Sequence, residues 1–180
     1  MGLNKFIKIK LGKLTLKGST RYIVRKKEFN NFETAKIVGI IFDATQTDQY
    51  TSARFLSNYL NEKKIKCRCL GFLKPQDITE APSTFSGFAF VSEKDFNIFG
   101  KPNNSLVLDY CKIDFDILID LHIKENYFIE AVLALSVAKM KIGLKNNDKG
   151  YYDLMIDLNE PITSERMVEQ IKIYLNKIKA

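Results

Sequence analysis

The sequence predicts a single α/β domain with a Rossmann-like, three-layer core and a mainly parallel sheet, preceded by a basic amphipathic N-terminal arm. Two observations lead to this prediction. Short hydrophobic runs alternate with segments of helical periodicity, which is the pattern of strand–helix–strand units. Positive charge is concentrated before residue 28, whereas the rest of the 180-residue chain is nearly neutral. Because this length suits one core, we expect the arm to comprise residues 1–30 and the domain residues 31–180.

The expected strands are short hydrophobic runs of the kind that is buried on both faces of a parallel sheet. They span residues 36–43, 65–73, 116–121, 140–144 and 152–158, and residues 87–91 fit one more short strand. Helical periodicity predicts helices over residues 45–64 and 126–139, and a final helix that starts near Pro161 and Thr163. Because such units form right-handed crossovers, helices should cover both faces of the sheet.

The arm supplies the whole net charge of +7. Residues 1–27 contain nine basic side chains and no acidic one. The rest of the chain contains 19 basic and 21 acidic residues, so its charges nearly cancel. The nine are Lys5, Lys8, Lys10, Lys13, Lys17, Arg21, Arg25, Lys26 and Lys27. Such a cluster neutralises phosphates, so we expect these side chains to contact RNA or the ribosome without reading base sequence. Two alternatives are attachment to an anionic membrane surface and a solvated helix that only covers the sheet.

The conformation of the arm is less clearly specified. Apolar residues recur at helical spacing, at Leu3, Ile7, Leu11 and Leu14, although residues 7–11 also alternate as a strand would. A glycine weakens a helix by about 1 kcal/mol relative to alanine. We therefore expect a helix that is broken near Gly12 or Gly18 and docks its apolar stripe on the body.

Several protein classes are excluded by composition. The apolar stretches fall far short of the roughly 20 residues that cross a bilayer. Lysines interrupt the N-terminal apolar residues, which a secretory signal would not allow, so we expect a cytoplasmic protein. Three cysteines do not make a disulfide framework, and Cys67 and Cys69 are spaced too closely for a metal knuckle. With a single histidine in the chain, we expect no metal, and we expect the cysteines to be small buried hydrophobes.

Polar side chains follow two of the predicted strands, at the edge where ligands bind in open parallel sheets. Asp43, Thr45 and Asp48 follow the first strand, and Asp120 and His122 end the strand over residues 116–121. His122 could act as a general base oriented by Asp120, but a single histidine after a buried strand is more often a structural hydrogen-bonding group. We therefore expect no catalytic residue, and we favour Asp120 as the functional side chain of this edge.

The loop over residues 94–102 is a further candidate for lining a pocket. It mixes aromatic residues with Lys94, Asn97 and Lys101, and such loops often bind ligands on a rigid scaffold. The alternative is a loop whose Phe96 and Phe99 plug the edge of the core. Glycine-rich phosphate-binding patterns are absent from the sequence, and the turn over residues 44–47 has no glycine. The sequence therefore predicts no nucleotide cofactor.

Residues 115–121 (FDILIDL), the alanine-rich helix that follows them and residues 140–144 (MKIGL) resemble the N-terminal half of heptosyltransferase-type glycosyltransferases. That resemblance implies a Rossmann-like fold more than an activity, because the glycine of the family's first loop is missing from Phe42-Asp43-Ala44-Thr45. The whole chain is similar to an uncharacterised family of small bacterial proteins that have a basic N-terminus, a Lys-Asp-Phe-Asn-x-Phe-Gly loop and an Asp-x-Leu-Ile-Asp-Leu strand.

These observations lead to one functional expectation and two alternatives. We expect a non-enzymatic cytoplasmic protein that binds RNA or the ribosome through its basic arm, without a cofactor. The first alternative is a glycosyltransferase-like half-domain that binds a sugar or nucleotide and is degenerate or dependent on a partner. The second alternative is a peripheral membrane protein.

Overall fold

The computed structural model describes residues 3–20, 23–77 and 86–178. Within these residues, six strands form one sheet in the order β3-β2-β1-β4-β5-β6, and every neighbouring pair is parallel. The strands are β1 (Ile37–Asp43), β2 (Lys66–Phe72), β3 (Phe88–Val91), β4 (Ile117–Asp120), β5 (Met140–Leu144) and β6 (Leu154–Ile156). The helices are α1 (Leu3–Ser19), α2 (Thr47–Glu62), α3 (Ser105–Lys112), α4 (Tyr127–Leu135) and α5 (Ser164–Lys177).

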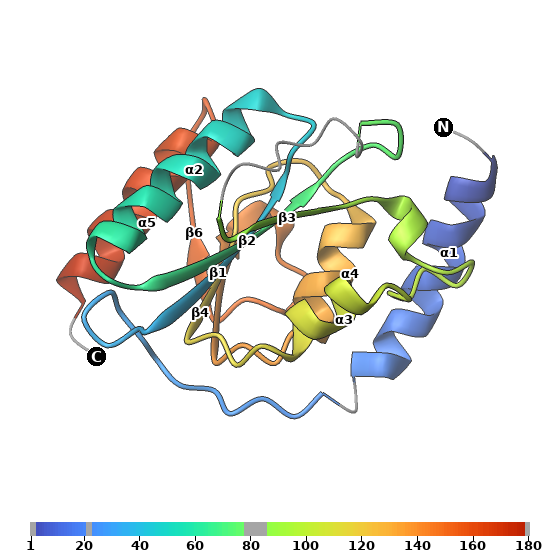
Figure 1. Ribbon diagram of the computed structural model, residues 1–180, viewed down its shortest axis with the longest axis horizontal. Helices are drawn as coiled ribbons and strands as arrows, with labels where there is room; N and C mark the ends of the chain where they lie inside the picture. The colour runs from blue at the N-terminus through green and yellow to red at the C-terminus, as the bar shows by residue number, and fades with distance from the viewer. Residues whose placement is uncertain (1–2, 21–22, 78–85, 179–180) are drawn as a thin grey trace.

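The three layers follow from alternation along the strands. Val38, Ile40 and Phe42 of β1 point into a core under α2 and α5, whereas Ile41 points into a second core under α3 and α4. Figure 1 shows these two helix pairs on opposite faces of the sheet, with α1 outside α4. The predicted α/β, three-layer fold with a parallel sheet is therefore confirmed.

The expected elements differ from the structure at two places in the body. Helix α3 was not predicted, because its eight residues span only two turns, with Val107, Tyr110 and Cys111 as the buried side chains. Helix α4 ends at Leu135 instead of continuing to residue 139. Ser136 ends it, because its hydroxyl accepts a hydrogen bond from the amide of Ala138 at 3.2 Å and turns the chain toward β5.

The cysteines lie where small hydrophobes are expected. Cys67 is half-buried, Cys69 and Cys111 are buried, and all three are free thiols. The Sγ atoms of Cys67 and Cys69 lie 3.7 Å apart on the same side of β2. Burial raises the pKa of the Cys111 thiol to about 12, so this group stays protonated at neutral pH.

Helix α1 runs without a break through Gly12 and Gly18, so the expected interruption is wrong. Gly12 lies at the contact with α4, where a β-carbon would be 2.2 Å from the hydroxyl of Tyr127. The missing side chain lets the two helices approach closely, and this contact offsets the low helix propensity of glycine. The Tyr127 hydroxyl in turn donates a hydrogen bond to the carbonyl oxygen of Gly100 at 2.9 Å.

The docked face of α1 is also not the expected stripe. Leu16 is buried and Ile9 is half-buried against α4, whereas Ile7 is 44% exposed and Leu14 is 73% exposed. Lys8 fixes the rotation of the helix, because its Nζ donates to the carbonyl oxygens of Glu93 at 2.7 Å and Phe96 at 2.6 Å. Helix α1 therefore presents an outward face that is both apolar and basic.

The segment after α1 is tied to the body by Arg25. Its Nε donates to the carbonyl oxygen of Ala138 at 2.8 Å and its Nη2 to that of Lys139 at 3.2 Å. The same guanidinium forms an ion pair with Asp153. Residues 23–30 thus run along the molecule beside the start of β5, as Figure 1 shows at its lower edge.

Candidate functional site

The strand order places a cleft at the carboxyl edge of the sheet. Strand β2 lies on one side of β1, and β4 lies on the other side. The connections that follow β1 and β4 therefore run in opposite directions, which makes a switch point in the strand order. Open α/β sheets bind ligands at such a switch point. A cleft of about 150 Å³ lies there. It is lined by Asp43, Thr45, Phe72, Leu73, Lys74, Pro75, Glu93, Asn126 and Phe128.

Asp43 and Thr45 form a fixed turn on one side of the cleft. Oδ1 of Asp43 accepts hydrogen bonds from the Thr45 amide at 3.0 Å and the Thr45 hydroxyl at 2.6 Å. The Asp43 amide donates to Oε1 of Gln49 at 3.1 Å. Among the described residues, Oδ2 of Asp43 accepts no hydrogen bond, so this oxygen is available to a ligand.

Asn126 also lines the cleft, as the N-cap of α4. Its side-chain oxygen accepts a hydrogen bond from the Phe128 amide at 3.0 Å, which leaves the amide nitrogen without a partner in the described part of the chain. Phe72 and Phe128 form the apolar floor, with their rings stacked and the centroids 5.6 Å apart. The cleft therefore combines a hydrogen-bond acceptor, a donor and an apolar surface.

A buried polar network lies behind this edge. Asp120 is fully buried, and its Oδ1 accepts from the His122 amide at 3.1 Å and contacts His122 Nδ1 at 2.5 Å. The Tyr152 hydroxyl donates to Oδ2 of Asp120 at 2.9 Å. Asn147 donates to the carbonyl oxygen of His122 at 2.8 Å, which fixes the backbone at His122. All these contacts lock the side chains in place.

Two pKa values in this network are shifted. Burial lowers the pKa of His122, but the adjacent carboxylate of Asp120 outweighs it, so the net shift is upward from the ordinary value. Burial, followed by the charge of Asp120, raises the pKa of Tyr152 far above its usual range. The upward shift favours the protonated form of His122 beside the Asp120 side chain, which describes a buried ion pair more than a general base.

The other candidate pocket residues are not brought together. Asp48 lies in the first turn of α2 and accepts a hydrogen bond from the Ser164 hydroxyl at 3.3 Å, on the outer face of the helical layer. Asn97 closes its own loop, because its Oδ1 accepts from the amides of Phe99 at 2.9 Å and Lys101 at 3.1 Å. Lys94 and Lys101 are exposed on that loop.

The loop over residues 94–102 plugs the core through one aromatic side chain. Phe96 is buried against Phe72 and Phe128, with ring centroids 5.8 and 4.9 Å away, whereas Phe99 is 48% exposed. The cleft residues that the sequence interpretation missed are Lys74, Glu93 and Asn126. They follow β2, follow β3 and precede α4, so applying the carboxyl-edge rule to every strand would have found them.

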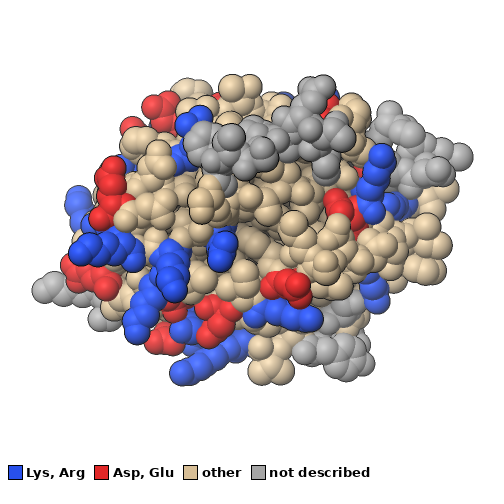
Figure 2. All heavy atoms as spheres, in the orientation of Figure 1, with Lys and Arg blue, Asp and Glu red and all other residues tan. Residues whose placement is uncertain are grey.

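The basic residues of the N-terminal segment have different roles. Lys8 and Arg25 bond to the body, and Lys27 pairs with Asp153 at 3.0 Å although its side chain is 70% exposed. Lys10, Lys13 and Lys26 are exposed and form no ion pair within the described residues. The side chains of Lys5, Lys17 and Arg21 lie outside the described part of the chain. On the face in Figure 2, basic and acidic side chains are intermixed along the lower left edge.

A family model matches residues 4–178, which include all of α1 except Leu3 and the whole sheet. The chain belongs to a family of unknown function (DUF6913). The expected similarity to an uncharacterised family is thereby confirmed, whereas the comparisons show no similarity to glycosyltransferases. A comparison with curated proteins finds no match. None of the described helices combines the length and apolar character of a membrane span.

Proposed function

We propose that this protein binds a small, uncharged, polyhydroxylated molecule, such as a monosaccharide, in the cleft at the switch point. The observation that supports the proposal is that an open acceptor, Asp43 Oδ2, and an open donor, the side-chain amide of Asn126, line the same cavity of about 150 Å³. Hydroxyl groups both donate and accept, so a polyol satisfies both groups. The stacked rings of Phe72 and Phe128 supply an apolar surface for its C–H groups.

Charge distinguishes a polyol from a nucleotide. Two carboxylates, Asp43 and Glu93, line the cleft, and Lys74 is the cation among its lining residues. A phosphate group would meet these two carboxylates, and the turn after β1 offers no glycine for close backbone approach. Of the two ligands named in the glycosyltransferase-like alternative, the site therefore favours a sugar over a nucleotide.

The proposal predicts thermal stabilisation by neutral sugars. A monosaccharide at about ten times its dissociation constant would stabilise the fold by about 1.4 kcal/mol. For a domain of this size, that free energy raises the melting temperature by roughly 3–5 °C. Asp43→Asn should abolish the shift because it changes the acceptor, and scanning fluorimetry with a panel of neutral sugars measures it.

The matched control is Asp48→Asn, which makes the same chemical change five positions away on the outer face of α2. This variant should keep the full shift. The proposal is wrong if no neutral sugar stabilises the protein, or if a nucleoside diphosphate stabilises it and the sugars do not.

A second candidate function is binding of RNA by the N-terminal segment. The observation that favours it is the exposure of Lys10, Lys13 and Lys26 without ion-pair partners among the described residues. Because α1 and Arg25 hold this segment against the body, its lysines form a surface with a fixed shape. A fixed cationic surface loses less conformational freedom on binding than a mobile tail.

The salt dependence of the affinity for RNA tests this candidate function. For a single-stranded RNA, each neutralised phosphate contributes about −0.7 to the slope of log K against log salt. Changing Lys10, Lys13 and Lys26 to glutamine should therefore flatten the slope by roughly 2, as followed by fluorescence anisotropy. The control changes the exposed Lys63, Lys66 and Lys112 to glutamine and should leave the slope unchanged. Equal slopes for both triple variants would contradict the candidate.

A further inference from the structure

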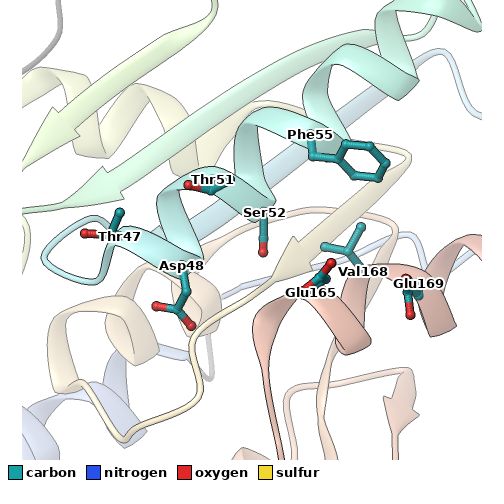
Figure 3. Close-up of a pocket in the computed structure, with 8 residues that line it drawn as sticks. All are labelled: Thr47, Asp48, Thr51, Ser52, Phe55, Glu165, Val168 and Glu169. Atoms are coloured by element: carbon teal, nitrogen blue, oxygen red, sulfur yellow. The ribbon is translucent and has the colours of Figure 1, made fainter.

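A groove lies between α2 and α5. It has a volume of about 570 Å³ and lies on the outer surface of the helical layer, away from the switch point. Figure 3 shows Asp48 and Ser52 extending from α2 toward α5, with Glu165 and Val168 facing them from α5. A hydrogen bond of 3.0 Å between the hydroxyls of Ser52 and Ser164 closes the bottom of the groove.

One exposed aromatic side chain and three acidic side chains line the groove. Phe55 is 55% exposed, with Nζ of Lys172 4.6 Å from its ring centroid, whereas Val168 is only 1% exposed at the base of the groove. Asp48, Glu165 and Glu169 line the rims, and none of them forms an ion pair within the part of the chain that the structure describes. The groove therefore fits a segment that has apolar side chains flanked by positive charges.

The outward face of α1 has this chemistry. Ile7 and Leu14 are exposed although they are aliphatic, and Lys10 and Lys13 lie exposed between them. Ile7, Lys10 and Leu14 are spaced three and four residues apart, so they share one side of the helix. Large aliphatic side chains left exposed beside lysines indicate a surface that a protein partner covers.

Figure 1 places α1 and the α2–α5 pair at opposite ends of the molecule, so α1 cannot reach the groove of its own chain while it is docked on α4. A second copy can reach it. An RNA backbone would match the lysines but would leave Ile7 and Leu14 without apolar partners, so the observations favour a protein groove over a phosphate backbone.

We propose that the outward face of α1 of one copy docks in the α2–α5 groove of a second copy. Leu14 and Ile7 contact Phe55, and the two lysines between them face the acidic rims. The contact is heterologous, because the two surfaces differ, and it therefore joins copies head to tail into open chains unless the rotation closes a ring. This inference does not depend on the ligand cleft or on RNA binding.

Analytical ultracentrifugation of the full chain tests the contact. The weight-average mass should rise above the monomer mass as concentration increases, without stopping at a dimer, and should fall as salt is raised. Lys10→Glu with Lys13→Glu should give a monomer, and so should Glu165→Lys with Glu169→Lys. Unfolding midpoints of both double variants show whether each has kept its fold.

A mixture of the two double variants is the decisive sample. Each one alone has like charges on both surfaces, whereas the mixture restores opposite charges at both possible contacts, so association should return. Lys63→Glu with Lys66→Glu is the control and should associate as the unmodified chain does. The proposal is overturned if the unmodified chain remains a monomer at every concentration, if both charge reversals leave the mass unchanged, or if the mixture stays monomeric.

Discussion

Asp120→Ala should cost about 3–5 kcal/mol of the free energy of unfolding. The carboxylate is fully buried and accepts hydrogen bonds from the backbone of His122, the ring of His122 and the hydroxyl of Tyr152. Removing it leaves a buried imidazole ring and a buried phenol without their partner, and unpaired buried groups of this kind are expensive. Urea denaturation followed by circular dichroism at pH 6 measures the loss.

The matched control for this prediction is Asp157→Ala. Asp157 pairs with Lys145 at 2.6 Å, but both side chains are more than half exposed, so its loss should cost at most about 1 kcal/mol. A similar cost for the two variants would show that the buried network adds nothing beyond a surface ion pair.

Because of the same network, the contribution of His122 to the free energy of unfolding should fall as pH rises. The folded protein holds the pKa of His122 above its ordinary value, so the unfolded chain releases its proton first as pH rises. The stabilising contribution is complete below the unfolded pKa of about 6.5 and is lost as pH rises through the folded value. Asp120→Ala removes this contribution together with the acceptor.

The second large effect is expected at Lys141, a lysine that is only 1% exposed. Its Nζ donates to the carbonyl oxygen of Leu133, in the last turn of α4, at 2.6 Å. Burial, followed by the nearby charge of Arg25, lowers its pKa to about 7. Between about pH 7 and 10.5 the unfolded chain therefore binds a proton that the folded protein does not.

In that window, stability should rise with pH by up to about 1.4 kcal/mol per unit from this group alone. Lys141→Met fills a similar volume without the amine, so it should be more stable than the unmodified protein at pH 7, and its advantage should shrink toward pH 10. The measurement is the difference in unfolding free energy between the two proteins across this range. Lys112→Met, at an exposed position, should show a constant difference, and parallel profiles for Lys141→Met would contradict the assigned cause.

The strands were predictable because burial on both faces leaves a local signature. The run that becomes β1 is apolar or glycine at every position before Asp43, and in β5 only Lys141 departs from this pattern. The outward face of α1 was not predictable, because its rotation depends on Gly12 meeting Tyr127 and on Lys8 reaching carbonyl oxygens more than 80 residues away. Periodicity records which residues are apolar, but it does not record which neighbour they meet.

The candidate-site residues also divide into those that a local sequence pattern predicts and those that it does not. Asp43 and Thr45 were found because they directly follow the first buried strand, whereas Lys74 and Glu93 follow strands in the least regular part of the sequence. Asp48 was grouped with Asp43 by proximity along the chain, but the first turn of α2 directs it to the other side of the helical layer. The α2–α5 groove depends on the packing of two segments more than a hundred residues apart, which no local pattern contains.

The anchoring of Arg25 has a practical consequence for the study of the N-terminal lysines. A chain shortened to begin at residue 28 would lack α1, which covers Tyr127 and Phe96, and would leave Asp153 without its guanidinium partner. Truncation would therefore change the solubility and the stability of the remaining chain together with its charge. Single substitutions at outward positions are the cleaner way to learn what this end of the molecule recognises.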